Sequence, residues 1–202
     1  MITLMQDNLA RLQALPLITV AYIEGMALGG GAELVTACDY RLSRENAIIG
    51  FVQVRIGITT VWGGGARLVQ LIGYPKALNL IATGRTFSGI EGARMGFIDQ
   101  LLPSVETVIS NAHQTAQLQA KPPTSYSVAH HQAEVLQNAR QFLMPFLVLP
   151  KETMLTGKAV ASESRPKLDD ALQAELQHGL KVWGGPIHQK ALSGKVNHKR
   201  DN

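Results

Sequence analysis

A run of glycines is the feature that most constrains how this chain can fold. Residues 25–33 read GMALGGGAE, and they follow an apolar run at 17–23 that predicts a buried strand. The apolar residues at 34–38 then indicate a short buried helix. Glycines between a strand and a helix let the backbone approach a ligand and leave N–H groups that can stabilise an anion. A tight turn that needs glycine for packing explains the same pattern, so both interpretations stay open here.

Length and charge place the chain among ordinary globular domains. Its 202 residues are enough for one domain with a real core, and the formal net charge is +4. A nucleic-acid protein would show a denser basic stripe with interleaved aromatic residues, so we expect no nucleic-acid partner. No run is long enough to span a membrane, and the first residues lack a signal-peptide pattern, so we expect a cytosolic protein without a membrane partner.

The single cysteine limits redox and metal chemistry. Cys38 is the only one, so an internal disulfide and a cysteine-based metal site are excluded. Its apolar neighbours indicate a buried structural thiol rather than a nucleophile.

Hydrophobic spacing in the first half predicts an α/β layered core. Strands are expected at 17–23, 39–43, 47–51 and 97–102, and helices at 1–14, 66–72, 76–83 and 88–95, the last with Ser88 as its N-cap. Strands that alternate with helices in this way are typical of layered α/β folds.

The second half is expected to be mainly helical. Helices are predicted at 105–119, 130–143, 151–160, 167–182 and 186–192, with a linker at 121–127. We therefore divide the chain into an α/β core at 1–112, an inserted linker and helix at 113–136, and a C-terminal helical region at 137–202.

Several motifs in the first half resemble the crotonase (enoyl-CoA hydratase/isomerase) superfamily. They are LPLI at 15–18, GMALGGGAE at 25–33, CDYR at 38–41, the glycines at 63–64 followed by ARL at 66–68, TGR at 83–85 and EGARMGFI at 91–98. VWGG at 61–64, VWGGP at 182–186 and the ALGGGAE form of the central motif resemble the ethylmalonyl-CoA decarboxylase branch of that superfamily.

The resemblance implies a crotonase-like core and an acyl-CoA thioester as substrate. The family's opening strands and helix, which supply one oxyanion-hole N–H and part of the CoA cleft, have no counterpart before Met1. We therefore expect an N-terminally truncated core, and the activity of this chain is left open. The C-terminal helical region implies assembly into a homotrimer or hexamer.

The resemblance also implies that catalysis passes through an enolate. The Gly30 N–H would be one donor to the enolate oxygen. Hydratases of the family use two glutamates, one in the glycine motif and one twenty positions later; here these positions hold Glu33 and Gln53. A glutamine can hydrogen-bond water but cannot take its proton, which argues against hydration. It also removes a charge that would repel a substrate carboxylate.

These residues favour decarboxylation of ethylmalonyl-CoA or methylmalonyl-CoA, with no metal or redox cofactor. We expect Leu28, Gly29, Val61 and Trp62 to bind the substrate, with the last two forming an apolar wall that strips water from the departing carboxylate. Core packing explains Trp62 equally well. Glu33 would orient the substrate or protonate the enolate, although a glutamate in a first helical turn is also favourable with the helix dipole.

Two other functions stay open, namely hydration or isomerisation of an enoyl-CoA and a truncated, non-catalytic subunit. The histidines assemble no site; His130 and His131 with Glu134 lack the spacing of a zinc-binding helix. The basic residues Lys190, Lys195 and Lys199 would either reach CoA phosphates or form a solvated charged end.

Overall fold

Two small sheets and the helices between them form the core of the protein. The computed structural model describes residues 1–103 and 128–194. One sheet has the strand order β1-β3-β6 and is parallel, whereas the other has the order β2-β4-β5, with β2 and β4 parallel and β4 and β5 antiparallel. The strands are β1 (Val20–Ile23), β2 (Met26–Leu28), β3 (Tyr40–Arg44), β4 (Ile48–Gly50), β5 (Thr86–Ser88) and β6 (Gln100–Leu102).

Short helices of the first half fill the space between and beside the sheets. They are α1 (Ile2–Gln13), α2 (Gly30–Val35), the 3₁₀ helix η1 (Val52–Ile56), α3 (Gly64–Ile72), α4 (Tyr74–Thr83) and α5 (Gly89–Met95). The Ser88 hydroxyl accepts a hydrogen bond from the Glu91 N–H, which confirms the predicted N-cap of α5.

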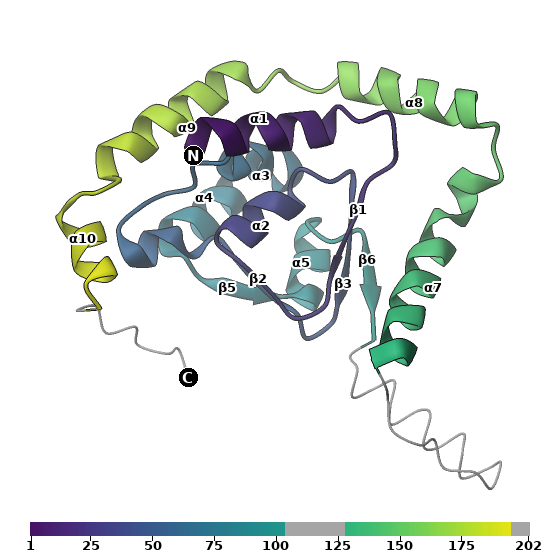
Figure 1. Cartoon of the computed structure of the whole chain (residues 1–202), viewed down its shortest axis with the longest axis horizontal. Helices are drawn as coiled ribbons and strands as arrows, with labels where there is room; N and C mark the ends of the chain where they lie inside the picture. The colour runs from purple at the N-terminus through teal and green to yellow at the C-terminus, as the bar shows by residue number, and fades with distance from the viewer. Residues whose placement is uncertain (104–127, 195–202) are drawn as a thin grey trace, which may run out of the picture.

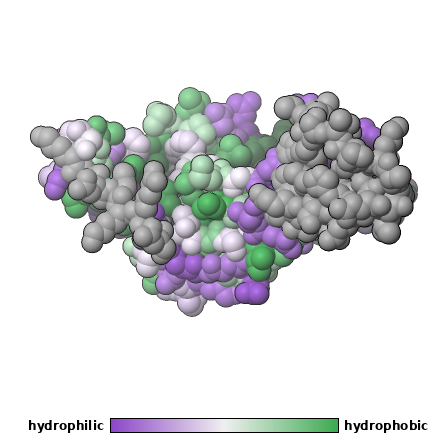
Figure 2. Space-filling view, turned by 90° about the horizontal axis from the view of Figure 1, so that it is seen from below, coloured by the Kyte–Doolittle hydropathy of each residue, from purple (hydrophilic) through white to green (hydrophobic). Residues whose placement is uncertain are grey.

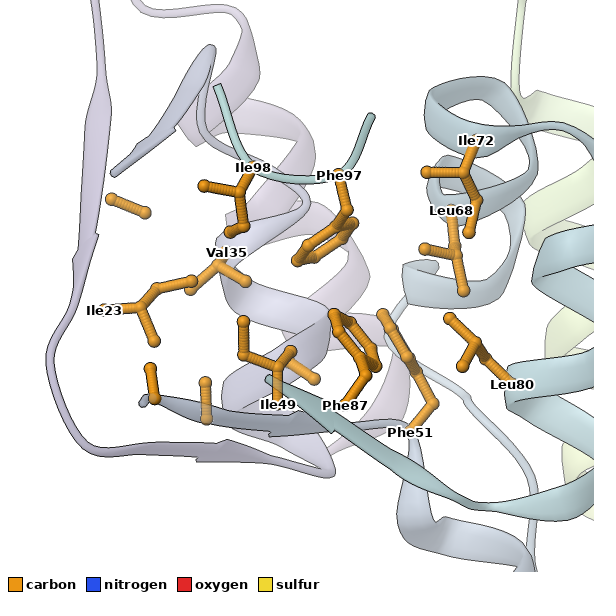
Figure 3. Packing of buried hydrophobic residues seen from close by; sticks show 14 of the residues in the cluster. Ile23, Val35, Ile49, Phe51, Leu68, Ile72, Leu80, Phe87, Phe97 and Ile98 are labelled. Atoms are coloured by element: carbon orange, nitrogen blue, oxygen red, sulfur yellow. The ribbon is translucent and has the colours of Figure 1, made fainter. Parts of the chain in front are cut away.

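Aromatic rings occupy the centre of the core. The rings of Phe51 and Phe87 each meet Phe97 edge to face, at centroid distances of 6.2 and 5.6 Å. Leu68 from α3 and Leu80 from α4 close one side of this cluster, as Figure 3 shows. Such edge-to-face pairs add to the stabilisation that apolar burial provides, so the cluster fixes α3 and α4 against the sheets.

The C-terminal helices form an outer arm around this core. They are α7 (Val128–Leu147), α8 (Lys151–Glu163), α9 (Asp169–Val182) and α10 (Pro186–Leu192), and α8 and α9 run across the top of the view in Figure 1. The fully buried Arg44 of β3 pairs with Glu134 of α7 at 2.8 Å. The Tyr40 ring also packs against Phe142 and Phe146 of α7, so polar and aromatic contacts together fix this helix on the first sheet.

Helix α8 is held by one ion pair rather than by apolar burial. None of its residues is buried. Lys158 pairs with Asp39 at 2.8 Å and also donates to the Leu17 carbonyl. Asp39 further accepts from the N–H and hydroxyl of Thr19. Burial opposes ionisation of Asp39, but the hydrogen bonds from Lys158 and Thr19 outweigh it and lower its pKa. Asp39 is therefore a structural residue.

The α/β class predicted from the sequence is confirmed, whereas some element boundaries were wrong. Residues 26–28 belong to a strand, β2, and not to the turn expected for the glycine stretch. Strand β5 was not predicted, because three residues are too short for an alternating pattern to be visible. Helix α7 continues through Pro145 to Leu147, beyond the end predicted at residue 143.

Some expectations fall outside the described residues. These are the helix at 105–119, the linker at 121–127 and the division at residues 112/113. The proposed division into three parts stays a prediction. Within residues 1–103 and 128–194, no helix is long and apolar enough to cross a membrane.

Candidate active site

The glycine stretch joins β2 to α2 and leaves a backbone donor exposed. Gly29, the N-cap of α2, has φ of 55°, a conformation that favours glycine. Its N–H donates to the Gly50 carbonyl at 2.9 Å, and the first helical hydrogen bond runs from the Glu33 N–H to the Gly29 carbonyl at 3.0 Å. The Gly30 N–H has no acceptor within residues 1–103 and 128–194. It is one of the free donors that every helix N-terminus leaves.

The residues predicted for the site line one mainly apolar cavity of about 450 Å³. All seven predicted site residues are in its wall: Leu28, Gly29, Gly30, Glu33, Gln53, Val61 and Trp62. The structure thus brings together residues from β2, α2, η1 and the loop before α3. A cavity of this size, apolar with a few polar groups, suits a small-molecule ligand.

Glu33 is the most constrained polar group in this cavity. It is 1% exposed. Its Oε2 accepts from the backbone N–H groups of Trp62 and Gly64, at 2.8 and 3.0 Å. Its Oε1 accepts from Gln53 Nε2 at 2.7 Å. A residue tied to three donors from distant segments has one defined position, so the carboxyl group is held in place before any ligand binds.

The surroundings of Glu33 favour its neutral form. Burial and the nearby charge of Glu175 raise its pKa from 4.5 to about 7, although the backbone N–H groups of Trp62 and Gly64 act in the opposite direction. At neutral pH the group is therefore divided between the acid and the carboxylate. A carboxyl group with a pKa near the working pH can deliver a proton as well as accept one.

Gln53 lies at the cavity wall with half of its amide unused. It is 8% exposed. Its Nε2 donates to Glu33, but in the described part of the chain its buried Oε1 has no hydrogen-bond partner. Buried polar atoms are rarely left in this way, and each one calls for an explanation.

Trp62 packs directly on the glycine motif. A Cβ added to Gly30 would lie 2.4 Å from the indole ring, so only glycine allows this approach. A Cβ on Gly64 would likewise meet Glu33 Cγ at 2.4 Å. The two glycine motifs at 25–33 and 61–64 therefore fit against each other, with Trp62 and Glu33 as the side chains at their contact.

A second carboxylate, Glu175 of α9, supports the same loop and was not predicted. It accepts from the N–H groups of Gly63 and Ala66, at 2.8 and 3.0 Å. Together with Glu33 it occupies four backbone donors at the start of α3, where negative charge is favourable. The sequence did not indicate a site role for Glu175, because it lies on a polar helix and more than a hundred residues separate it from Gly63 and Ala66.

Trp183 and Arg55 also line the cavity and were missed as site residues. Both tryptophans of the chain thus reach one cavity. The VWGG sequence around Trp62 is repeated around Trp183, and this repeat could have predicted that Trp183 also lies in the site. The Arg55 side chain is exposed, and its Nε donates to the Gly84 carbonyl at 2.9 Å, which places a positive charge at the rim.

Residues considered for other chemistry lie elsewhere. Cys38 is half-buried beside the core, and burial raises the pKa of its thiol. Lys190 is on α10, whereas Lys195 and Lys199 are outside the described residues.

The fold is that of the enoyl-CoA hydratases. The structure of an enoyl-CoA hydratase from Mycobacterium avium subsp. paratuberculosis is similar, with a TM-score of 0.72 at 19% identity, over 94% of this chain and 68% of the other. An enoyl-CoA hydratase from Bacillus halodurans gives a TM-score of 0.71 at 20% identity, over 96% and 66% of the two chains. These likenesses confirm the expected crotonase-like fold.

The sequence comparison shows the family. The profile of the enoyl-CoA hydratase/isomerase family matches residues 3–178, and the chain belongs to that family. It is 38% identical over 196 residues to an ethylmalonyl-CoA decarboxylase from Danio rerio, covering 96% of this chain and 57% of the relative. An ethylmalonyl-CoA decarboxylase from Xenopus laevis is 36% identical over 200 residues, covering 98% and 58%. The chain thus spans somewhat more than half the length of these curated relatives.

Proposed function

We propose that the chain is an acyl-CoA decarboxylase that acts on ethylmalonyl-CoA or methylmalonyl-CoA through an enolate. The observation that carries the proposal is Gln53, which donates to Glu33 at 2.7 Å where a hydratase of this family has a second glutamate. With one carboxyl group instead of two, the site lacks the paired bases that activate water. The names of the similar proteins support the same reaction.

The cavity offers a place for each step of that reaction. The Gly30 N–H would donate to the thioester oxygen, on which negative charge develops as the carbon–carbon bond to the carboxylate breaks. The electron pair of that bond enters the enolate, and carbon dioxide leaves. Val61 and Trp62 would surround the carboxylate with apolar surface and favour its loss. Arg55 at the rim would face the anionic CoA. No metal or redox cofactor enters this proposal.

Glu33 would complete the reaction as an acid. A pKa of about 7 leaves a large share of the carboxyl group protonated at neutral pH. The enolate carbon would take that proton, giving butyryl-CoA or propionyl-CoA, and Glu33 would regain a proton from solvent. The sequence suggested two roles for Glu33, namely orienting the substrate and protonating the enolate. Both are compatible with its hydrogen bonds, but its raised pKa favours the role of proton donor to the enolate.

Product analysis tests the proposal. Purified chain is incubated separately with ethylmalonyl-CoA, methylmalonyl-CoA and crotonyl-CoA, and the acyl-CoA products are separated by chromatography. We expect decarboxylated products from the first two and no hydration of the third. Hydration of crotonyl-CoA that survives in Glu33→Ala would contradict this assignment of the site. A chain that binds acyl-CoA but releases no carbon dioxide would support the non-catalytic alternative.

Assembly into a homotrimer or hexamer is part of the same proposal. Large apolar side chains are more than half exposed along the C-terminal arm, where they would be covered by another subunit: Leu136, Met144, Leu147, Val148, Leu149, Val160, Leu180, Ile187 and Leu192. Apolar surface also gathers at the centre of the face in Figure 2, above a hydrophilic band. Light scattering coupled to size-exclusion chromatography would measure the mass of the assembly. The cytosolic location expected from the sequence stays a prediction.

A further inference from the structure

Helix α9 packs directly on residues 61–66, the entry segment that leads into and begins α3. Figure 1 shows this helix beside α1 and α3. A Cβ added to Gly63 would lie 2.4 Å from Leu172 Cδ2 of α9, and one added to Gly179 of α9 would lie 2.2 Å from Val61 Cγ1. Glycine at both positions therefore allows the helix and the entry segment to touch.

The N–H groups of the entry segment are shared between two carboxylates. Four of them donate to a side chain, and they belong in chain order to Trp62, Gly63, Gly64 and Ala66. The first and third donate to Glu33 Oε2, whereas the second and fourth donate to Glu175 of α9. Because the donors alternate along the chain, neither set can move without the other.

The carbonyl groups of the entry segment are bound by other side chains. Gln6 Nε2 of α1 donates to the Val61 carbonyl at 3.0 Å, and Arg67 Nη2 donates to the Trp62 carbonyl at 2.8 Å. These bonds hold the segment to α1 and α3. Loss of Glu175 should therefore loosen the N–H side of the segment without unfolding it.

The position of the entry segment decides the geometry of the cavity. Its N–H groups hold one oxygen of Glu33, and its Trp62 ring packs on Gly30, where an added Cβ would lie 2.4 Å from the indole. A misplacement of about 1 Å in such a site can lower a rate about 100-fold. Whatever fixes the segment therefore also fixes the carboxyl group and the apolar wall.

We infer that Glu175 is a positioning residue for the proposed reaction: by binding the Gly63 and Ala66 N–H groups, it fixes the donors that hold the Glu33 carboxyl group. The inference rests on the proposed function, in which Glu33 protonates the enolate. Glu175 acts through Glu33 rather than on the ligand. Helix α9 thus sets the geometry of a proton donor that belongs to α2.

The charge of Glu175 acts together with its hydrogen bonds. With burial, it raises the pKa of Glu33 to about 7. The acid form, which the proposed protonation requires, therefore remains populated at neutral pH.

Hydrogen exchange at single amides, measured by NMR, tests the hold on the segment without a ligand. In Glu175→Gln the amide oxygen can accept from only one of the two N–H groups. Asp170→Asn is the matched control, because it removes an exposed charge from the same helix. Relative to the core amide of Leu80, the Trp62 and Gly64 amides should exchange at least about tenfold faster in Glu175→Gln and at an unchanged rate in Asp170→Asn.

The amides that bind Glu33 decide the result of this experiment. Unchanged exchange at Trp62 and Gly64 would overturn the inference even if Gly63 and Ala66 exchanged faster, because the latter two bind Glu175 directly. Glu175→Asp is the second variant should Glu175→Gln fail to fold. It keeps the charge but is one methylene shorter, so it cannot span both N–H groups and should give the same pattern.

Kinetics test whether Glu175 acts through Glu33. Release of carbon dioxide from ethylmalonyl-CoA is measured, and active sites are counted by titration with butyryl-CoA, so that any loss of folded protein is corrected. Glu175→Gln should lower kcat at least about tenfold and leave KM within about twofold. In a Glu33→Gln background the same change should lower kcat by no more than about twofold, since Glu33 transmits its effect.

The outcomes distinguish this inference from the proposed function. If the effects of the two substitutions on kcat multiply, the inference is overturned while decarboxylation stands. If the unaltered chain releases no carbon dioxide, the proposed function is contradicted, and the catalytic role of Glu175 with it. The exchange rates would then still show whether Glu175 holds the entry segment.

Discussion

Replacement of Glu33 by glutamine should change how stability depends on pH. Burial and Glu175 raise the pKa of Glu33 from 4.5 to about 7 in the folded chain. The folded state therefore holds this proton more tightly than the unfolded state. The stabilisation is fully present below pH 4.5 and is lost as the pH rises through about 7. Its full size is about 3 kcal/mol, and about 2.5 kcal/mol of it disappears between pH 5 and pH 8.

Glu33→Gln removes this titration with little change of shape. The glutamine oxygen can still accept from the Trp62 and Gly64 N–H groups, which the Glu33 Oε2 now occupies. Urea unfolding of both proteins, followed by tryptophan fluorescence at pH values from 5 to 8, gives the free energy of unfolding. Every other titrating group is common to both proteins, so the difference between them isolates Glu33.

The expected trend has a definite sign. Relative to Glu33→Gln, the unaltered chain should lose about 2.5 kcal/mol as the pH rises from 5 to 8, and the difference should level off above pH 8. A difference that stays constant within about 0.5 kcal/mol over this range would show that Glu33 does not have a raised pKa. The proton-donating role in the proposed reaction would then lose its basis.

Three further changes probe the packing of the site and the arm. Gly64→Ala places a Cβ 2.4 Å from Glu33 Cγ and should cost about 2 kcal/mol or more in urea unfolding, whereas Gly31→Ala, with open space around it, should be nearly neutral. Lys158→Met removes the buried ion-pair partner of Asp39, which keeps a 3.5 Å contact with the exposed Arg165 and its hydrogen bonds from Thr19; we expect a loss of about 2 kcal/mol and faster proteolysis within α8, against the unaltered chain as reference. Acyl-CoA binding should change the fluorescence of the two tryptophans, since both line the cavity, and an unchanged spectrum at saturation would contradict the position of the cavity.

The sequence was informative where the chemistry depends on local patterns. The glycine motif located Gly30 and Glu33, the spacing of twenty residues located Gln53, and the structure brings all three to one cavity. The hydrophobic periodicity located most helices, because their apolar faces repeat over two or more turns. The hydrogen bond between Gln53 and Glu33 could not be predicted. Its 2.7 Å distance depends on η1 packing beside α2, which no local pattern specifies.

Long-range contacts account for most of what was missed. Glu175 reaches the loop before α3 only because the C-terminal arm returns along the core (Figure 1). The raised pKa of Glu33 depends on that contact and on burial, neither of which a linear pattern contains. Strand β5 is three residues long, and its partner β4 defines it more than its own composition does.

The formation of product in D₂O tests the central claim most directly. Ethylmalonyl-CoA is incubated with the purified chain in D₂O, and the acyl-CoA is analysed by mass spectrometry. Loss of carbon dioxide followed by protonation of the enolate predicts butyryl-CoA that carries one deuterium at the α-carbon. Recovery of ethylmalonyl-CoA unchanged at every enzyme concentration would contradict the account.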